Sequence, residues 1–535
     1  MTSQNPTEPS QLFSPYNSNQ DNISQDDMIE SRLLKRHQDF INSDEDFTKI
    51  KESTMSSELS LGENSRNLIF KQRRLRQNII VPEINQSLKD KLSIPYDWFE
   101  KCNNTVYSIA DISQIISAFK NNTDIKQKFF GLVGLRKILL APDVPIEDIL
   151  NEGIIDDLVK LLELNTNPEF QYESLLCLSY LSSITNEQIA YLIISKGIKQ
   201  ILKIFDSPIE EIKWQVPLLV GNLISNSYGI RDLLIKEKIY DKLLTILTST
   251  NNKKLIKNCT WSISNFFRIK PILKYDIAKK SIKIFARNLL LLQDDSDFLS
   301  DACFILCFMT ENYKEGIKEL MEFDILETIL KLLDSDVVYI QITCLRLIGN
   351  IAAGNANQTQ KLIDLGLLPQ LKKNILSQKK TVRKETAWIL SNIAAGTQKQ
   401  IEQLISEDFL LSFENVILFD EPDVKKECIW AMCNLTSVKN PVFLKKILEQ
   451  GILACLQQCL LINDAKNLAV CLEALNNLLE FGKENKINEV NPVVKEIERL
   501  DMYNILEELQ KHPVEIVYEK TLKLLLEYFD VQYNI

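Results

Sequence analysis

The sequence predicts an all-α fold in which short helices stack into a right-handed superhelical solenoid, preceded by a disordered N-terminal tail. Three observations in the 535 residues predict this fold class. They are an internal repeat of about 42 residues, amphipathic helices of about 10 to 16 residues separated by short breaks, and almost no strand patterns. Each repeat buries its apolar stripe only against its neighbours, which gives the array a long concave surface.

The repeat is visible as a tryptophan followed four residues later by an asparagine. The pair occurs three times in helical segments, as Trp261 with Asn265, Trp388 with Asn392, and Trp430 with Asn434. On a helix, two residues with this spacing are stacked neighbours on one face. Successive positions of the ladder lie 42 or 43 residues apart, and further positions are Tyr180, Asn222, Phe308, Asn350 and Asn476. A period of this length fits the armadillo and HEAT class of helical solenoids.

The helices are expected from about residue 109 onward, and the predicted repeat domain spans residues 105 to 530 with about ten repeats. A glycine recurs where one helix ends and the next begins, at Gly153, Gly197, Gly366 and Gly451. Glycine is the usual residue for the left-handed turn that follows a helix C-terminus. Pro217 lies inside one of the expected helices and is predicted to kink or interrupt it.

Composition argues against several classes of function. The chain is 45% apolar and 25% charged, and it contains neither an apolar run long enough to span a membrane nor a signal-peptide pattern. Its 11 cysteines include no CxxC pair, which indicates free buried thiols in an intracellular protein. With two histidines and no GxGxxG or phosphate-loop pattern, we expect no catalytic residues, no metal and no cofactor. The net charge of −10 disfavours direct nucleic-acid binding and favours a basic partner.

Residues 1 to about 90 differ from the rest because they are rich in Ser, Asn, Gln, Asp and Pro, which predicts disorder. A basic island interrupts this tail without an acidic residue, and its charged members are Arg66, Lys71, Arg73, Arg74 and Arg76. Such an island in an acidic protein can dock on the protein's own surface or on an acidic partner.

A row of tryptophan and asparagine along a groove suits an extended peptide. A carboxamide can pair with both the N–H and the C=O of a ligand backbone, whatever the ligand's sequence. Parallel indoles form slots for the methylene stems of lysine or arginine, and cation–π attraction adds about 0.5–2 kcal/mol per contact. Glu385 and Glu427, close to one turn before two of the indoles, can meet the charged tips.

These segments resemble the importin-α family, the adaptors that carry proteins with basic nuclear localisation signals. RKETAWILSNIAAGTQKQI, LRLIGNIAAGNANQTQKLID and KKECIWAMCNLTS resemble its seventh, sixth and eighth armadillo repeats. DACFILCFMT, KNCTWSISNFFR and PIEDILNEGIID resemble its fifth, fourth and first repeats. The match covers about residues 105 to 530 and indicates a divergent member. The resemblance implies two cargo sites, a major one on repeats two to four and a minor one on repeats six to eight.

The resemblance implies a complete minor site, here called the C-terminal site. Its residues by this numbering are Arg346, Asn350, Glu385, Trp388, Asn392, Glu427, Trp430 and Asn434. The major site, here called the N-terminal site, keeps Gln215, Asn222, Trp261, Asn265 and Asp301, with Arg268 also matching. It has otherwise eroded: Leu176 and Tyr180 replace the pair of repeat two, Leu218 replaces the tryptophan of repeat three, and Asn226 replaces the lysine-clamping Asp. Trp214, one turn before Leu218, either substitutes for the missing indole or packs.

The resemblance also implies partners. They are cargo proteins with basic nuclear localisation signals, importin-β bound through the tail, and an export receptor of the family type. The protein would then shuttle between cytoplasm and nucleus, without inserting into a membrane. In the tail, Lys71 to Arg76 correspond to the end of the importin-β-binding segment, which can mimic cargo and occupy the groove. The stretch before it has fewer basic residues than the family pattern, so either the importin-β contact is reduced or a shorter helix suffices.

Two alternatives belong to other classes of function. A scaffold of the β-catenin kind would bind extended peptides or an acidic or structural partner without transport, but it would need a basic groove, whereas Glu385 and Glu427 favour a basic ligand. An enzyme would need converging acid–base or nucleophilic residues, and the sequence offers none.

Overall fold

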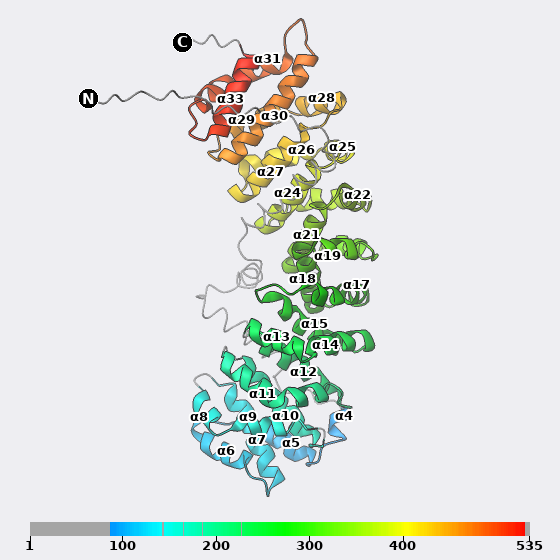
Figure 1. The fold of residues 1–535 in the computed structure, drawn as a ribbon, viewed down its shortest axis with the longest axis vertical. Helices are drawn as coiled ribbons and strands as arrows, with labels where there is room; N and C mark the ends of the chain where they lie inside the picture. Colours follow the sequence, from blue (N-terminus) through cyan, green and yellow to red (C-terminus); the bar gives the residue numbers. More distant parts are fainter. Residues whose placement is uncertain (1–85, 142–143, 164, 184–185, 226, 530–535) are drawn as a thin grey trace, which may run out of the picture. The chain divides into compact units, whose positions relative to one another are not determined.

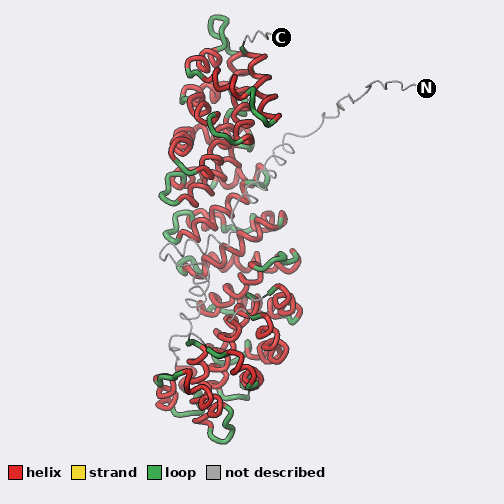
Figure 2. Tube along the Cα trace, turned by 90° about the vertical axis from the view of Figure 1, so that its left-hand side faces the viewer, coloured by secondary structure: helices red, strands yellow, loops and turns green. Residues whose placement is uncertain are grey.

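The computed structural model describes residues 86–141, 144–163, 165–183, 186–225 and 227–529. Helices joined by turns and loops make up these residues, and the part of the chain described contains no strand beyond one isolated bridge between Ile487 and Val490. Figure 2 shows the helices joined by short loops. The all-α armadillo fold predicted from the sequence is confirmed.

The chain divides into two compact units, whose described parts are residues 86–350 and 351–529. The helices that begin in the first unit are α4 (Gln86–Lys89), α5 (Tyr96–Asn104), η1 (Ile109–Asp111), α6 (Ile112–Phe119), α7 (Ile125–Leu139), α8 (Ile146–Asn151), α9 (Ile154–Lys160), α10 (Pro168–Ser183), α11 (Glu187–Ile204), α12 (Glu210–Ile224), α13 (Tyr228–Lys236), α14 (Ile239–Ser249), α15 (Lys253–Arg268), α16 (Tyr275–Ala278), η2 (Lys279–Ser281), α17 (Ile282–Leu291), α18 (Ser296–Asn312), α19 (Lys314–Leu320), α20 (Leu326–Leu332) and α21 (Val338–Ala352). Helix α4 falls within the tail expected to end near residue 90.

In the second unit each repeat consists of two shorter helices followed by a longer one. Its helices are α22 (Ala356–Asp364), α23 (Leu367–Asn374), α24 (Lys380–Ala394), α25 (Gln398–Ser406), α26 (Phe409–Phe419), α27 (Pro422–Leu435), α28 (Pro441–Glu449), α29 (Ile452–Leu460), α30 (Ala465–Glu484), α31 (Pro492–Arg499), α32 (Met502–Leu509) and α33 (Glu515–Tyr528).

The long last helices of successive repeats lie side by side and carry the ladder. In the first unit α7 contacts α10, α10 contacts α12, α12 contacts α15, and α15 contacts α18. In the second unit α24 contacts α27, α27 contacts α30, and α30 contacts α33. Figure 1 shows this stacking within each unit. Equivalent residues of neighbouring repeats are therefore brought next to each other.

Local capping fixes where the helices begin. Asn252 accepts a hydrogen bond from the backbone N–H of Leu255 at the start of α15, and Asp464 caps α30 in the same way. Asn355 and Thr397 form capping boxes, one repeat apart, at the starts of α22 and α25. These side chains satisfy N–H groups that the first turn of a helix leaves unbonded.

The turns between first and second helices confirm three of the four predicted glycine positions. Gly153, Gly366 and Gly451 have φ of 72°, 90° and 89°, the left-handed region that glycine occupies without steric cost. The prediction for Gly197 was wrong, because α11 runs through it as one continuous helix. A β-carbon at Gly197 would lie 3.0 Å from Cγ2 of Val159, so close packing explains that glycine instead. The interruption expected at Pro217 is also absent, since α12 continues past it.

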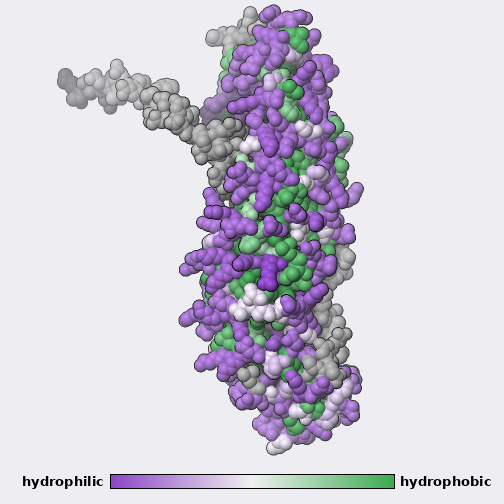
Figure 3. Space-filling view, turned by 90° about the vertical axis from the view of Figure 1, so that its right-hand side faces the viewer, coloured by the Kyte–Doolittle hydropathy of each residue, from purple (hydrophilic) through white to green (hydrophobic). Residues whose placement is uncertain are grey.

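Apolar side chains fill the space between helices, and all 11 cysteines are buried free thiols, as the sequence predicts. Figure 3 shows one face of the surface, where hydrophilic residues predominate and hydrophobic residues show in patches. No helix among the described residues has both the length and the apolar character that crossing a membrane requires.

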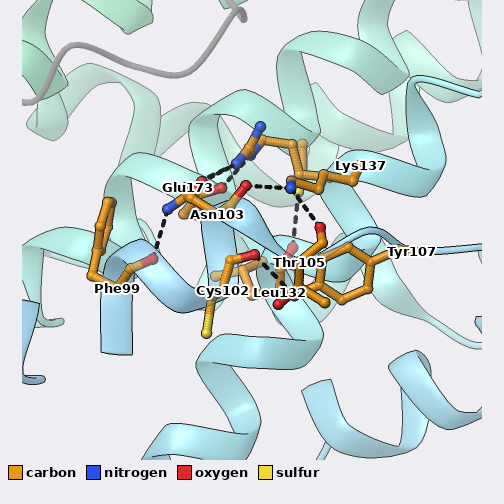
Figure 4. A network of polar contacts seen from close by, with 10 residues as sticks. Phe99, Cys102, Asn103, Thr105, Tyr107, Leu132, Lys137 and Glu173 are labelled. Carbon is orange, nitrogen blue, oxygen red and sulfur yellow. Dashed lines mark hydrogen bonds and ion pairs between the residues drawn. The ribbon is translucent and has the colours of Figure 1, made fainter. Parts of the chain in front are cut away.

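A buried ionic network ties the start of the described chain to repeats one and two (Figure 4). Arg136 on α7 is 2% exposed and its Nε lies 2.5 Å from Oε2 of Glu173 on α10, which is 0% exposed. Arg136 also donates to Oδ1 of Asn103 on α5 at 2.6 Å. The neighbouring Lys137 ammonium donates to the backbone oxygens of Asn103 and Thr105. Three helices thus converge on one compensated pair of charges.

Candidate peptide-binding site

The ladder asparagines hold neighbouring repeats together. Nδ2 of Asn222 donates to the backbone oxygen of Ser179 at 3.0 Å, and Nδ2 of Asn265 donates to that of Gly221 at 3.1 Å. In the second unit, Nδ2 of Asn434 donates to the backbone oxygen of Ser391 at 3.3 Å. One amide hydrogen of each side chain is therefore engaged inside the protein, in a bond to the preceding repeat.

Asn350, in the first unit, also donates through Nδ2 to the preceding repeat. Its Nδ2 lies 3.4 Å from the backbone oxygen of Cys307 and 3.1 Å from Oγ1 of Thr310. Its Oδ1 is buried without a hydrogen-bond partner. Arg346, one turn earlier on α21, is 2% exposed. The side-chain oxygen of Asn350 is thus shielded from water and accepts no hydrogen bond from the described part of the protein.

Asn392 on α24 differs from the other ladder asparagines because it makes no hydrogen bond to the preceding repeat. Its side chain is 0% exposed, and neither Nδ2 nor Oδ1 has a hydrogen-bond partner among the described residues. A buried carboxamide without partners costs about 1–3 kcal/mol, and more than nine-tenths of buried polar groups in proteins are paired. Both polar groups of this side chain, one donor and one acceptor, are therefore unsatisfied within the described residues.

The C-terminal site has one indole that is buried and one that is partly open. Trp388 is fully buried, whereas Trp430 on α27 is half-buried and its Nε1 donates to Oδ1 of Asn467 at 3.1 Å. Glu385 on α24 and Glu427 on α27, each three residues before a tryptophan of the same helix, are buried. Asn467 on α30 is itself 3% exposed, so it fixes the orientation of the Trp430 ring.

The N-terminal site retains one half-buried indole, that of Trp261, which packs against Gly221. A β-carbon on Gly221 would lie 2.4 Å from Cζ3 of Trp261, so the ring of Trp261 rests directly on the glycine. Asn265, one turn later, is bonded to the backbone oxygen of the same glycine. Any larger residue at position 221 would displace the ring.

The acidic residue of the N-terminal site is already paired. Oδ1 of Asp301 on α18 lies 3.1 Å from a guanidinium nitrogen of Arg268 and accepts from Oγ of Ser264 at 3.1 Å. The Arg268 guanidinium also stacks on the Phe304 ring, 4.1 Å from its centroid. The Asp301 side chain is 8% exposed, and its charge is compensated by the Arg268 guanidinium.

The eroded positions of repeats two and three are apolar and packed. Leu176, Tyr180 and Leu218 are at most 9% exposed, and Gln215 is buried with them. Trp214 is 8% exposed, and the ammonium of Lys254 lies 4.2 Å from the centroid of its ring. These positions offer no carboxylate and no open indole.

Comparisons with known proteins identify the family. Residues 355–395 match the Armadillo/beta-catenin-like repeat family. The chain is 32% identical over 400 residues to importin subunit alpha-1b of Oryza sativa subsp. japonica, covering 74% of each chain. It is 34% identical over 399 residues to importin subunit alpha-B of Dictyostelium discoideum, covering 74% of this chain and 77% of that one. The chain belongs to the importin-α family. As a member of that family it is a non-enzymatic armadillo adaptor, as the sequence predicts.

Solved structures agree on the fold of this importin-α family member. An engineered protein from a structural genomics consortium aligns with a TM-score of 0.65 and 21% identity, covering 78% of this chain and 98% of that one. The identity to the importin-α relatives leaves roughly two-thirds of aligned positions different, which fits the divergent member expected from the resemblance.

The importin-α ladder ends one residue away from its predicted position. Asn477, rather than Asn476, makes the bond to the preceding repeat, through Nδ2 to Oγ1 of Thr436 at 3.1 Å. Asn476 instead donates to Glu480 on its own helix. The spacing from Asn434 is 43 residues for the true position, within the range that the ladder already uses elsewhere.

Sequence reasoning missed two residues of this importin-α that position the indoles. Gly221 is the seat of Trp261, and Asn467 holds Trp430. Each lies about one repeat from its tryptophan, so a search for small or amide residues at that distance would have found them. The basic residues of the tail, Arg66, Lys71, Arg73, Arg74 and Arg76, and also Asn226, lie outside the described residues. Within the described ranges no cluster of potential metal ligands occurs.

Proposed function

We propose that this importin-α family member is a nuclear import adaptor that binds the basic nuclear localisation signals of cargo and links them to importin-β. Its relatives carry the name importin subunit alpha, which supports the transport role. Under this proposal it shuttles between cytoplasm and nucleus and returns with an export receptor. The tail segment 66–76 contacts importin-β, and without importin-β it competes with cargo.

One observation carries the proposal for peptide binding: the buried carboxamide of Asn392, which has no partner at either atom. A peptide backbone supplies a donor and an acceptor at every residue, so it can satisfy this side chain whatever its sequence. The half-buried ring of Trp430 then receives a lysine or arginine stem. Glu385 on α24 and Glu427 on α27 add negative charge on the helices that carry Trp388 and Trp430.

The test is a fluorescence-anisotropy titration of a labelled basic peptide against the full chain and its Asn392→Ala variant. Loss of a backbone-pairing carboxamide should weaken binding about tenfold, since 1.4 kcal/mol is a tenfold change and a hydrogen bond contributes about 0.5–1.5 kcal/mol. Asn415→Ala is the matched control, because Asn415 is exposed on α26 and bonds only to its own helix. Equal affinities of the two variants would remove Asn392 from the binding site.

A second measurement addresses the tail and the transport partner. Removing residues 1–90 should tighten peptide binding, since a tethered segment competes at an effective concentration up to about millimolar. Purified importin-β should bind the full chain and fail to bind the truncated one. An unchanged peptide affinity after truncation rejects competition by the tail, and preference for an acidic peptide over the basic one would favour the scaffold.

A further inference from the structure

The indole of Trp214 is covered by a cation that the protein itself provides. Trp214 lies on α12, one turn before Leu218, in the repeat that has lost its ladder tryptophan. Lys254 belongs to the first turn of α15 in the next repeat, and its ammonium lies 4.2 Å from the centroid of the Trp214 ring. This is the geometry of a cation–π contact.

Other contacts hold the two helices in this arrangement. Nδ2 of Asn258 on α15 donates to the backbone oxygen of Trp214 at 2.8 Å. Asn252, the N-cap of α15, donates to Oε2 of Glu210 in the first turn of α12 at 2.9 Å. One bond to the backbone and one between side chains therefore link repeats three and four on either side of the contact.

The ring of Trp214 also carries a polar atom without a partner. The side chain is 8% exposed, and its Nε1 makes no hydrogen bond. The indole therefore contributes its face to the lysine while its edge remains unbonded. If position 214 only filled the core, an apolar side chain would pack there equally well and would bury no unbonded donor.

We propose that Lys254 is a specificity-determining residue that closes the repeat-three position of the N-terminal site to cationic ligand side chains. Resting on the function proposed above, this means that the protein's own ammonium takes the place that a ligand's lysine or arginine would take on an indole. A cationic side chain approaching here meets a like charge instead of an open ring. The N-terminal site therefore selects against basic residues at this register, and two repeats further along the charge of Asp301 is compensated by Arg268.

The test asks whether removing Lys254 improves the binding of a basic peptide. The full chain carrying Trp430→Ala, which weakens the C-terminal site, is the parent, and Lys254→Glu and Lys254→Met are added to it. Lys253→Glu is the matched control: Lys253 is exposed in the same helical turn, so it changes net charge and helix-dipole interaction equally. Affinity is measured by fluorescence anisotropy with circular dichroism for folding.

Lys254→Glu should tighten binding about tenfold and Lys254→Met about threefold, since an open indole and a removed like charge contribute together. Lys253→Glu should change affinity less than about threefold. Adding Trp214→Leu to Lys254→Glu should abolish the gain. Equal effects at positions 253 and 254, or a gain that survives without the indole, overturn the inference. Absence of peptide binding by the unmodified full chain would instead reject the proposed function.

Discussion

The buried pair of Arg136 and Glu173 should be among the most sensitive positions of the first unit. Replacing Glu173 with glutamine leaves the guanidinium of Arg136 at 2% exposure, with Asn103 still accepting one hydrogen bond. Unit charges 4 Å apart attract by about 4 kcal/mol at an effective dielectric of 20, and breaking a buried pair typically costs about 3–5 kcal/mol. We therefore expect Glu173→Gln to destabilise the surrounding repeats by about 3 kcal/mol.

Hydrogen exchange followed by mass spectrometry is the appropriate assay. Repeats of a solenoid open in local units, so a single global unfolding free energy would mix distant events. A loss of about 3 kcal/mol corresponds to more than 100-fold faster exchange of the amides that open with this network. Peptides from α5, α7 and α10 should show it, whereas peptides from α30 in the second unit should keep their wild-type rates.

Glu152→Gln provides the control. Glu152 lies 2.7 Å from Lys120, but the two side chains are 53% and 37% exposed. Exposed pairs contribute about 0–1 kcal/mol, so its removal should change exchange less than about fivefold. If Glu173→Gln accelerates exchange no more than Glu152→Gln does, burial does not strengthen the pair and the reasoning fails.

Three further outcomes are expected. Replacing both Trp388 and Trp430 with alanine should weaken basic-peptide binding at least about 30-fold, and Trp261→Ala should reduce the affinity less. Fluorescence-anisotropy titrations measure both affinities, and the reverse order would show that the N-terminal site dominates. Burial raises the pKa of the Cys455 thiol to about 12, so it should resist a thiol reagent until denaturant is added, whereas rapid labelling of the native protein would refute this. Burial alone would raise the pKa of Asp420, but the hydrogen bond to its arginine partner lowers it below 3.8. The ion pair with Arg383 therefore stabilises the fold above that pH, and this stabilisation is lost as the carboxylate is protonated at lower pH. Asp420→Asn should then reduce the fall in melting temperature between about pH 5 and about pH 3. Parallel curves for the variant and the wild type would contradict this.

The regular features of the fold follow from the sequence because they repeat. A left-handed turn between first and second helices is needed in many repeats, and glycine marks it at three of them. The structure puts Lys238, Asp408 and Asp501 at comparable turns with φ between 54° and 66°. No sequence pattern identifies these non-glycine turns, since the backbone there is imposed by how the two helices pack.

Contacts between repeats were harder to anticipate, although their sequence separations are regular. Arg136 and Glu173, like Trp430 and Asn467, are 37 residues apart. The ladder bonds to backbone oxygens join residues 43 or 44 apart. The period therefore states which residues can meet. It does not state which of them face each other, because that depends on the rotation of each helix about its axis.

The asparagine ladder shows why recurrence alone does not assign a function. A residue repeated at one register could be retained for the ligand or for the stacking of repeats, and both uses require the same amide. The structure separates them atom by atom: Asn265 and Asn434 each give one hydrogen to a backbone oxygen of the preceding repeat. Asn392 makes no such bond although it is more deeply buried than either of them. Alanine at position 265 should therefore lose repeat stability as well as affinity, and alanine at position 392 should lose affinity alone.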